Sequence, residues 1–320
     1  MTPLWSVMIP AYNCAGYLRE TLAGILAQDP GPDAMQIEVV DDASTRDDPA
    51  AVVEELGRGR VGFFRQPANV GHVRNFNTCL ERAKGRLVHL LHGDDRVREG
   101  FYARMAAPFL EHSEIGAAFC RQIIVDGRGN WLAISPLERP ESGILPDWLE
   151  TLAVGQRLQA PAMVVRREVY RRLGGFDPRF SCYGEDWEMW VRIAARYPVW
   201  YEPEPLAFYR IHGESLSGLS QRSGDNGRDL RLAIEINRSH LPPEKAEDLT
   251  RQALESFALA CLRRARRILA SQDGDGGGVG TALAQIREAW RTSPSPLIAR
   301  KCLPVLGLCA RSALRGGHGR

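Results

Sequence analysis

The feature that most constrains the fold is an alternation, in the first hundred residues, between short apolar runs and segments with helical periodicity. Four apolar runs have the length of strands and cover residues 5–10, 36–44, 61–67 and 86–95. The segments between them repeat apolar residues at spacings of three and four, as in 15–28 and 72–85. We expect Pro10 to stop the first strand and Gly85 to close the helix over 72–85. This alternation predicts βαβ units, and therefore an α/β fold with a mostly parallel sheet flanked by helices.

Two of the expected strands end in pairs of aspartates. Asp41 and Asp42 close the second strand, and Asp94 and Asp95 close the fourth. The carboxyl ends of strands form the ligand-binding crevice of open α/β sheets, so both pairs are expected to face one cleft. The alternative is that these aspartates are turn and helix-cap residues, which are common places for Asp.

The character of the chain changes after about residue 220. Helical periodicity continues over 227–270 and 281–292, separated by a glycine-rich stretch. We therefore predict one α/β domain over residues 1–220 and a helical C-terminal extension over 221–320, with a flexible glycine-rich linker near 273–280.

Charge is unevenly distributed along the chain. The formal net charge of +2 gives no reason to expect a nucleic-acid partner, yet residues 221–320 hold 17 Lys/Arg against 10 Asp/Glu. Residues 296–320 are apolar and basic without an acidic residue. This segment either packs as a helix on the core or makes a peripheral contact with anionic lipid.

Seven scattered cysteines without a C-x-x-C pair indicate reduced thiols and argue against a zinc site. The N-terminus lacks the basic and apolar regions of a signal peptide, and no apolar run reaches the ~18–20 residues of a spanning helix. We expect a cytoplasmic protein, with the inner face of the membrane as its place if the C-terminus binds lipid.

Seven short motifs follow one another over about residues 4–218. They are SVMIPAYN, VVDDAS, NVGHVRNFN, HLLHGDD, RREVYRRLGGFDPRF, GEDWEMWVRIA and YRIHGESLS. Their order and rough spacing resemble glycosyltransferase family 2, a family of inverting enzymes. The resemblance implies a GT-A fold, with a Rossmann-like mixed sheet flanked by helices. It also implies transfer of a sugar from a nucleotide-diphosphate sugar to an acceptor hydroxyl.

The resemblance places the nucleotide at the first two strand ends. It implies that Pro10, Ala11, Tyr12 and Asp42 hold the base and that Arg74, at a helix start, meets phosphate. A carboxylate accepts a hydrogen bond from the N3–H of uracil or thymine, so a UDP- or dTDP-type donor is favoured over GDP. The alternative for Asp42 is a cap of the helix that begins near Asp48.

The second acidic pair corresponds to the metal motif of the family. By resemblance Asp95 binds Mg²⁺ or Mn²⁺, and Asp94 binds the same metal or the ribose. His212 is implied to contact the metal, and Arg210 is a candidate for phosphate. The chain departs from the commonest pattern at His92, where relatives more often carry an acid that only accepts hydrogen bonds.

The motif GEDWEMW carries the residues expected to act on the acceptor. By resemblance Asp186 is the base and Glu185 helps to orient acceptor or metal, the alternative being that both complement a helix dipole. Trp187 is placed to stack on the acceptor sugar, although a tryptophan at helical spacing is also typical of a core.

Two other classes of function compete with glycosyl transfer. One is another nucleotide-binding α/β transferase, although the chain lacks the G-x-G-x-x-G and P-loop motifs of the commonest such folds. The other is a non-catalytic protein that keeps a GT-A-like fold. We expect an enzyme that glycosylates a glycan or lipid-linked acceptor in cell-surface polysaccharide biosynthesis.

Overall fold

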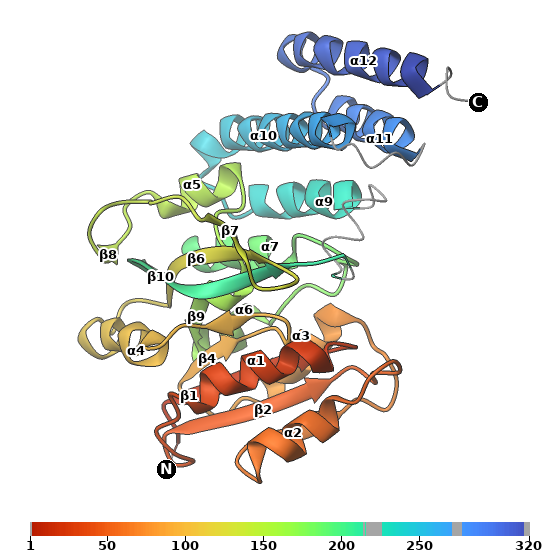
Figure 1. Ribbon diagram of the computed structural model, residues 1–320. Helices are drawn as coiled ribbons and strands as arrows, with labels where there is room; N and C mark the ends of the chain where they lie inside the picture. The colour runs from red at the N-terminus through yellow and green to blue at the C-terminus, as the bar shows by residue number, and fades with distance from the viewer. Residues whose placement is uncertain (1, 214, 216–225, 271–276, 317–320) are drawn as a thin grey trace. The chain divides into compact units, whose positions relative to one another are not determined.

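A computed structural model describes residues 2–213, 215, 226–270 and 277–316 (Figure 1). The chain divides into two compact units. The first consists of residues 1–148, 156–181 and 185–213, and the second of 149–155, 182–184 and 214–320. The second unit thus takes in two short segments that precede residue 213 in the sequence.

The first unit is built on a mixed sheet with the strand order β3-β2-β1-β4-β9-β6-β10-β5, in which β7 also pairs with β6 and β8 with β10. The strands β1 to β4 pair in parallel, whereas β9 is antiparallel to both β4 and β6. Their bounds are β1 Trp5–Ala11, β2 Met35–Asp41, β3 Gly62–Arg65, β4 Leu87–Leu90, β5 Arg96–Val97, β6 Ala117–Asp126, β7 Trp131–Ile134, β8 Gly143–Ile144, β9 Met163–Arg166 and β10 Val199–Ile211. The predicted α/β fold with a mixed sheet is confirmed.

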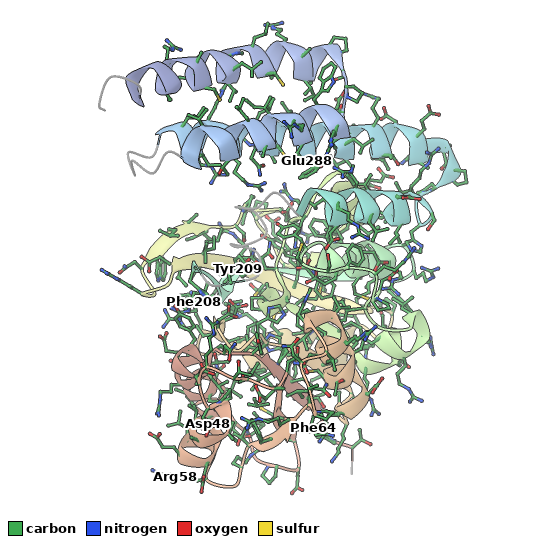
Figure 2. All side chains as sticks on the ribbon, turned by 90° about the vertical axis from the view of Figure 1, so that its right-hand side faces the viewer. Asp48, Arg58, Phe64, Phe208, Tyr209 and Glu288 are labelled. Atoms are coloured by element: carbon green, nitrogen blue, oxygen red, sulfur yellow. The ribbon has the colours of Figure 1, made fainter. Side chains whose placement is uncertain are left out.

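Helices accompany this sheet, and their starts follow local sequence signals. Asp48 precedes α2 and accepts a hydrogen bond from the amide of Ala50 at 3.1 Å, with Pro49 as the first helical residue (Figure 2). The helices of the first unit are α1 Ala15–Leu26, α2 Pro49–Gly57, α3 His72–Arg82, α4 Phe101–Glu111, α6 Arg167–Leu173 and α7 Glu185–Ala194, with a 3-10 turn at Ala160–Ala162. The helix α5, Trp148–Val154, belongs to the second unit from residue 149 on.

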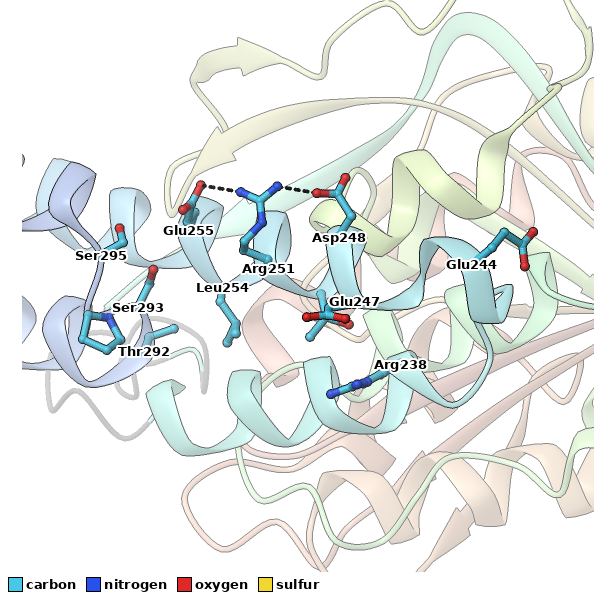
Figure 3. Close-up of a pocket in the computed structure, with 12 residues that line it drawn as sticks. Arg238, Glu244, Glu247, Asp248, Arg251, Leu254, Glu255, Thr292, Ser293 and Ser295 are labelled. Carbon is cyan, nitrogen blue, oxygen red and sulfur yellow. Dashed lines mark hydrogen bonds and ion pairs between the residues drawn. The ribbon is translucent and has the colours of Figure 1, made fainter.

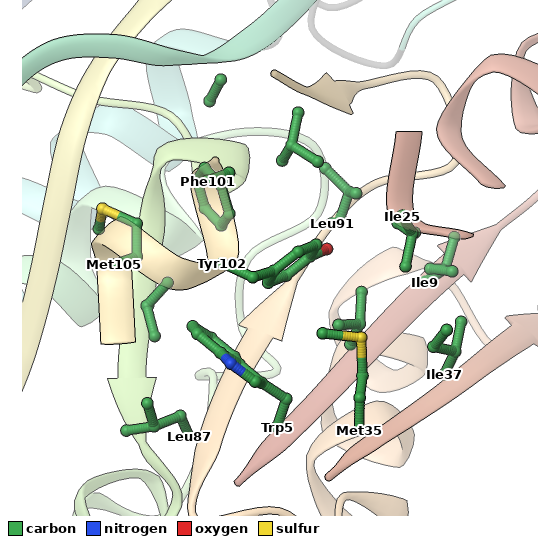
Figure 4. Close-up of a cluster of buried hydrophobic side chains, with 14 of the residues drawn as sticks. Trp5, Ile9, Ile25, Met35, Ile37, Leu87, Leu91, Phe101, Tyr102 and Met105 are labelled. Atoms are coloured by element: carbon green, nitrogen blue, oxygen red, sulfur yellow. The ribbon is translucent and has the colours of Figure 1, made fainter. Parts of the chain in front are cut away.

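The main core lies on one face of the sheet (Figure 4). Alternate residues of a strand point to opposite faces, so Trp5 and Ile9 of β1 share a face with Met35 of β2. Ile25 of α1 and Phe101 of α4 pack into the same cluster. This packing holds the carboxyl ends of β1, β2 and β4 in place at one edge.

Two local expectations are wrong. The strand β1 runs through Pro10 to Ala11, because the Pro10 carbonyl still accepts a hydrogen bond, from Gly93 at 3.1 Å. The helix α3 ends at Arg82, before Gly85. Gly85 is needed for another reason: a Cβ there would collide with backbone atoms of Trp5.

The second unit is helical. It contains α9 Asn226–Arg238, α10 Pro243–Ala270, α11 Gly277–Thr292 and α12 Pro296–Gly316, and α10 contacts the other three. Of the glycine-rich stretch expected as a linker, residues 277–280 lie in α11, and 273–276 fall outside the described residues. Among the helices that the structure describes, none combines the length and the apolar character needed to cross a membrane.

Candidate functional site

Three parallel strands end side by side at the edge of the sheet where the acidic residues lie. The amide of Asp42, just past β2, donates to the Ala11 carbonyl at 2.8 Å, and the amide of Gly93, past β4, donates to Pro10. These bonds tie both loops to the end of β1. The structure therefore brings the two predicted aspartate pairs to one edge.

Asp42 holds the loop that leads into α3. Its carboxylate accepts hydrogen bonds from the amides of Val70, at 2.7 Å, and Gly71, at 3.0 Å, and its carbonyl accepts from Asn69. Burial raises the pKa of Asp42 above its ordinary value, although the two amide bonds oppose that rise. The alternative that Asp42 caps the next helix is wrong, because Asp48 has that role.

Asp95 has a buried oxygen with no hydrogen-bond partner. The residue is 2% exposed, its Oδ1 accepts from the amide of Arg210 at 2.8 Å, and its Oδ2 is unpaired. Burial, together with the charge of Asp94, raises the pKa of Asp95 well above its ordinary value. A buried carboxylate oxygen without a partner is costly unless a cation or proton occupies its free side.

Asp94 is held by His212. The distance from His212 Nε2 to Asp94 Oδ2 is 3.0 Å. Burial alone would raise the pKa of Asp94, but the hydrogen bond to His212 opposes it, and this pKa lies below its usual range. The structure confirms that His212 and Asp94 meet, from positions 118 residues apart.

His92 completes a group of three potential metal ligands. One ligand atom each from His92, Asp94 and Asp95 lies within 4.8 Å of the others. The His92 ring stacks on Phe76 at 4.8 Å, and its buried Nε2 has no hydrogen-bond partner. Burial lowers the pKa of His92, which keeps the ring neutral and a lone pair free to bind a metal.

The donor set of this group fits a divalent cation. Two carboxylates and one imidazole suit Mn²⁺, and the carboxylates suit Mg²⁺ as well. The unpaired oxygen of Asp95 and the unpaired nitrogen of His92 are the observations behind this fit. Sequence reasoning did not name His92 as a candidate ligand, although its place just before the aspartate pair was a usable signal.

The acids at the start of α7 differ in their surroundings. Glu185 Oε1 lies 3.5 Å from His72 Nε2, and this interaction outweighs burial and lowers the pKa of Glu185. Asp186 accepts hydrogen bonds from Gln156 Nε2, at 2.8 Å, and from the amide of Trp187, at 2.7 Å. Burial and the charge of Glu185 raise the pKa of Asp186 to about 8. Once ionised, Asp186 is therefore a stronger base than an ordinary carboxylate, and it is fully ionised only above about pH 8.

The Phe76 ring contacts both His72 and His92. His72, the partner of Glu185, lies 5.5 Å from the Phe76 ring on one side, and His92 stacks on the same ring. The charges of both Asp94 and Glu185 act on the pKa of His92. The structure thus brings Glu185 and its partner His72 near the group of His92, Asp94 and Asp95.

The buried side chain of Arg210 contacts the turn that follows β4. Its side chain is 1% exposed, its Nε donates to the Asp94 carbonyl and its Nη2 to Glu20, both at 2.8 Å, and it lies over the Tyr17 ring. These contacts fix the turn that carries Asp94 and Asp95. A contact of Arg210 with phosphate stays a prediction.

The other predicted residues differ in exposure. Tyr12 is 48% exposed at the end of β1, where Pro10 and Ala11 are buried. Arg74 is exposed in the first turn of α3. Trp187 is 2% exposed, which does not favour stacking on an acceptor sugar.

The chain is similar to known proteins in sequence and in fold. Residues 6–174 match the family model described as glycosyl transferase family 2. An uncharacterized protein of Mycobacterium tuberculosis is 30% identical over 220 residues, which cover 65% of this chain and 67% of that protein.

Two solved structures share the fold at low identity. S. aureus TarS in complex with UDP-GlcNAc aligns with a TM-score of 0.69 at 16% identity, covering 99% of this chain and 92% of that one. The mannosyltransferase PcManGT from Pyrobaculum calidifontis, in complex with GDP-Man and Mn²⁺, aligns with a TM-score of 0.56 at 18% identity, covering 99% and 87%.

Proposed function

Because the chain belongs to glycosyl transferase family 2, we propose that it catalyses a metal-dependent, inverting transfer of a sugar. The chain has a GT-A fold and is a glycosyltransferase. The donor is a UDP- or dTDP-type sugar, and the acceptor is a hydroxyl of a glycan or lipid-linked glycan. The observation that carries this proposal is the group of His92, Asp94 and Asp95, with its unpaired buried atoms, on the same side of the fold as Asp186.

The metal ligands in this proposal are Asp95 Oδ2, Asp94 and His92. A bound divalent cation supplies positive charge that stabilises the departing diphosphate. His212, which sequence reasoning placed on the metal, orients the Asp94 carboxylate through its hydrogen bond. Arg210 fixes the backbone of the same turn, so that both carboxylates keep one orientation.

The nucleotide binds at the ends of β1 and β2. Each oxygen of the Asp42 carboxylate can accept a further hydrogen bond beyond the amide that it already binds, and a pyrimidine N3–H is such a donor. The exposed ring of Tyr12 covers the base. Arg74, exposed at the start of α3, contacts phosphate.

Asp186 takes the proton of the acceptor hydroxyl. One displacement at the anomeric carbon forms the new C–O bond as the bond to the diphosphate breaks, which inverts the configuration, and the hydroxyl proton passes to Asp186. Gln156 and the Trp187 amide hold the carboxylate in place. Glu185, kept ionised by His72, increases the proton affinity of Asp186.

We place the reaction in the cytoplasm, in cell-surface polysaccharide biosynthesis. The cysteines of the described residues form no disulfide, as suits a reducing compartment. An acceptor panel of polyprenyl-linked and free glycans tests this assignment.

The test is the release of nucleotide diphosphate from a panel of UDP-, dTDP- and GDP-sugars, with Mn²⁺ or with EDTA. We expect turnover that EDTA abolishes and that Asp186→Asn lowers by about 10²–10⁴-fold. Asp177→Asn, the same change at a carboxylate paired with Arg179, is the control and should keep activity. Full activity of Asp186→Asn would exclude it as the base, and absence of turnover with every donor would favour the non-catalytic alternative.

A further inference from the structure

The helices α11 and α12 carry a concentration of exposed apolar side chains. Twelve large apolar residues are exposed in the described part of the chain, and five of them lie on these two helices. They are Leu283, Trp290, Leu297, Leu303 and Leu306, with Trp290 at 48% and Leu303 at 68% exposure. We call this region the α11–α12 surface.

The exposed leucines of α12 are not needed for its packing. Ile298, Cys302, Val305 and Cys309 are buried and fall on one face of the helix, at spacings of four, three and four. The helix α12 contacts both α10 and α11. Leu303 and Leu306 therefore form a second apolar stripe, on the outside.

The same two helices are strongly basic. Residues 277–316 contain six Lys/Arg and one acidic residue, Glu288. Glu288 is paired with Arg231 of α9, so it does not neutralise the outer cations. The exposed cations of the surface are Arg287, Arg291, Arg300, Lys301 and Arg311, and none makes an ion pair within the described residues.

Another surface of the same unit shows that this charge pattern is local. A groove of about 690 Å³ is lined by α9, α10 and the turn between α11 and α12 (Figure 3). There Arg251 pairs with Asp248 and, at 3.8 Å, with Glu255. This groove is lined by four acidic residues and two arginines, so its charge is negative, whereas the exposed charges of α11 and α12 are positive.

We propose that the α11–α12 surface binds the headgroups of anionic lipids. Leucine and tryptophan side chains enter the boundary between headgroups and acyl chains, while Lys and Arg meet the lipid phosphates. A second copy of the chain fits this surface less well, because a symmetric pairing would oppose cations with cations. The proposal does not depend on which sugar the enzyme transfers.

Flotation of the full chain with phosphatidylcholine vesicles, with and without phosphatidylglycerol, tests the proposal. We expect binding only to the vesicles with phosphatidylglycerol, weakened by salt. The variant Arg300→Gln/Lys301→Gln/Arg311→Gln should bind on the order of 100-fold more weakly, since each cation near a membrane contributes about 1 kcal/mol. The matched control Arg58→Gln/Arg86→Gln/Arg171→Gln removes three exposed cations from the first unit and should bind like the parent protein.

A second variant, Leu303→Ser/Leu306→Ser, separates apolar insertion from charge and should also bind more weakly. Donor turnover and the thermal midpoint of each variant should match the parent, which shows that it is folded. The proposal is overturned if the parent does not float with phosphatidylglycerol vesicles, or if the triple variant binds as its control does. It is also overturned if light scattering shows a dimer that the leucine variant dissociates.

Discussion

Replacing Glu185 with glutamine should shift the pH dependence of glycosyl transfer to lower pH. The pKa of Asp186 is raised from 3.8 to about 8, first by burial and second by the charge of Glu185. Glutamine has nearly the same shape and removes only that charge. Because burial is the larger cause and remains, we expect the pKa of Asp186 to fall by about one unit, which corresponds to about 1.4 kcal/mol.

The direction of the effect follows from the role of a base. Asp186 must be ionised to accept a proton, so kcat/KM should rise with pH and level off above about pH 8, the pKa of this group. In Glu185→Gln the same rise should occur about one unit lower. The activity of the variant relative to the parent should therefore be higher at a pH below both pKa values of Asp186 than at high pH.

The assay is the initial rate of nucleotide diphosphate release at saturating metal, measured across the neutral range. Glu168→Gln, the same change at an exposed residue of α6, is the control and should leave the profile unchanged. An acidic limb that stays in place, or that moves to higher pH, would refute the electrostatic coupling of Glu185 to Asp186.

Three further changes probe the site and the fold. Asp95→Asn should remove both the metal-dependent turnover and the rise in thermal midpoint on adding Mn²⁺, because a neutral amide binds the cation poorly. His92→Phe keeps an aromatic ring on Phe76 but lacks the nitrogen, so a weaker Mn²⁺ dependence is expected in a titration; an unchanged midpoint concentration would exclude His92 as a ligand. Gly85→Ala should lower the free energy of unfolding in urea by about 1–3 kcal/mol, because the new Cβ meets backbone atoms of Trp5.

The sheet and its acidic edge were predictable because both follow from local patterns. Alternating apolar runs and helical segments specify parallel strands, and parallel strands bring their carboxyl ends to one edge. Asp42, Asp94 and Asp95 could therefore be placed together before any contact was known. The mistaken ends at Pro10 and Gly85 arose because proline and glycine can meet several structural needs, which only their neighbours distinguish.

The contacts between site residues were harder to predict from the sequence. Gln156 reaches Asp186 across 30 positions, and His212 reaches Asp94 across 118. No periodicity in the sequence relates such residues. The burial of Arg210 and Trp187 was equally hidden, since their residue types suit a ligand contact as well as a core.

By itself, the sequence determined the order of strands and helices, the acids at the strand ends and the basic, apolar C-terminus. These features depend on residue type and spacing within one segment, where the energetics of burial and turns act locally. The tertiary structure decided which atoms remain unpaired, which of the two α7 acids holds its proton near neutral pH, and which face of α12 stays exposed. Those properties depend on distances between groups far apart in the chain, because burial and charge act through space.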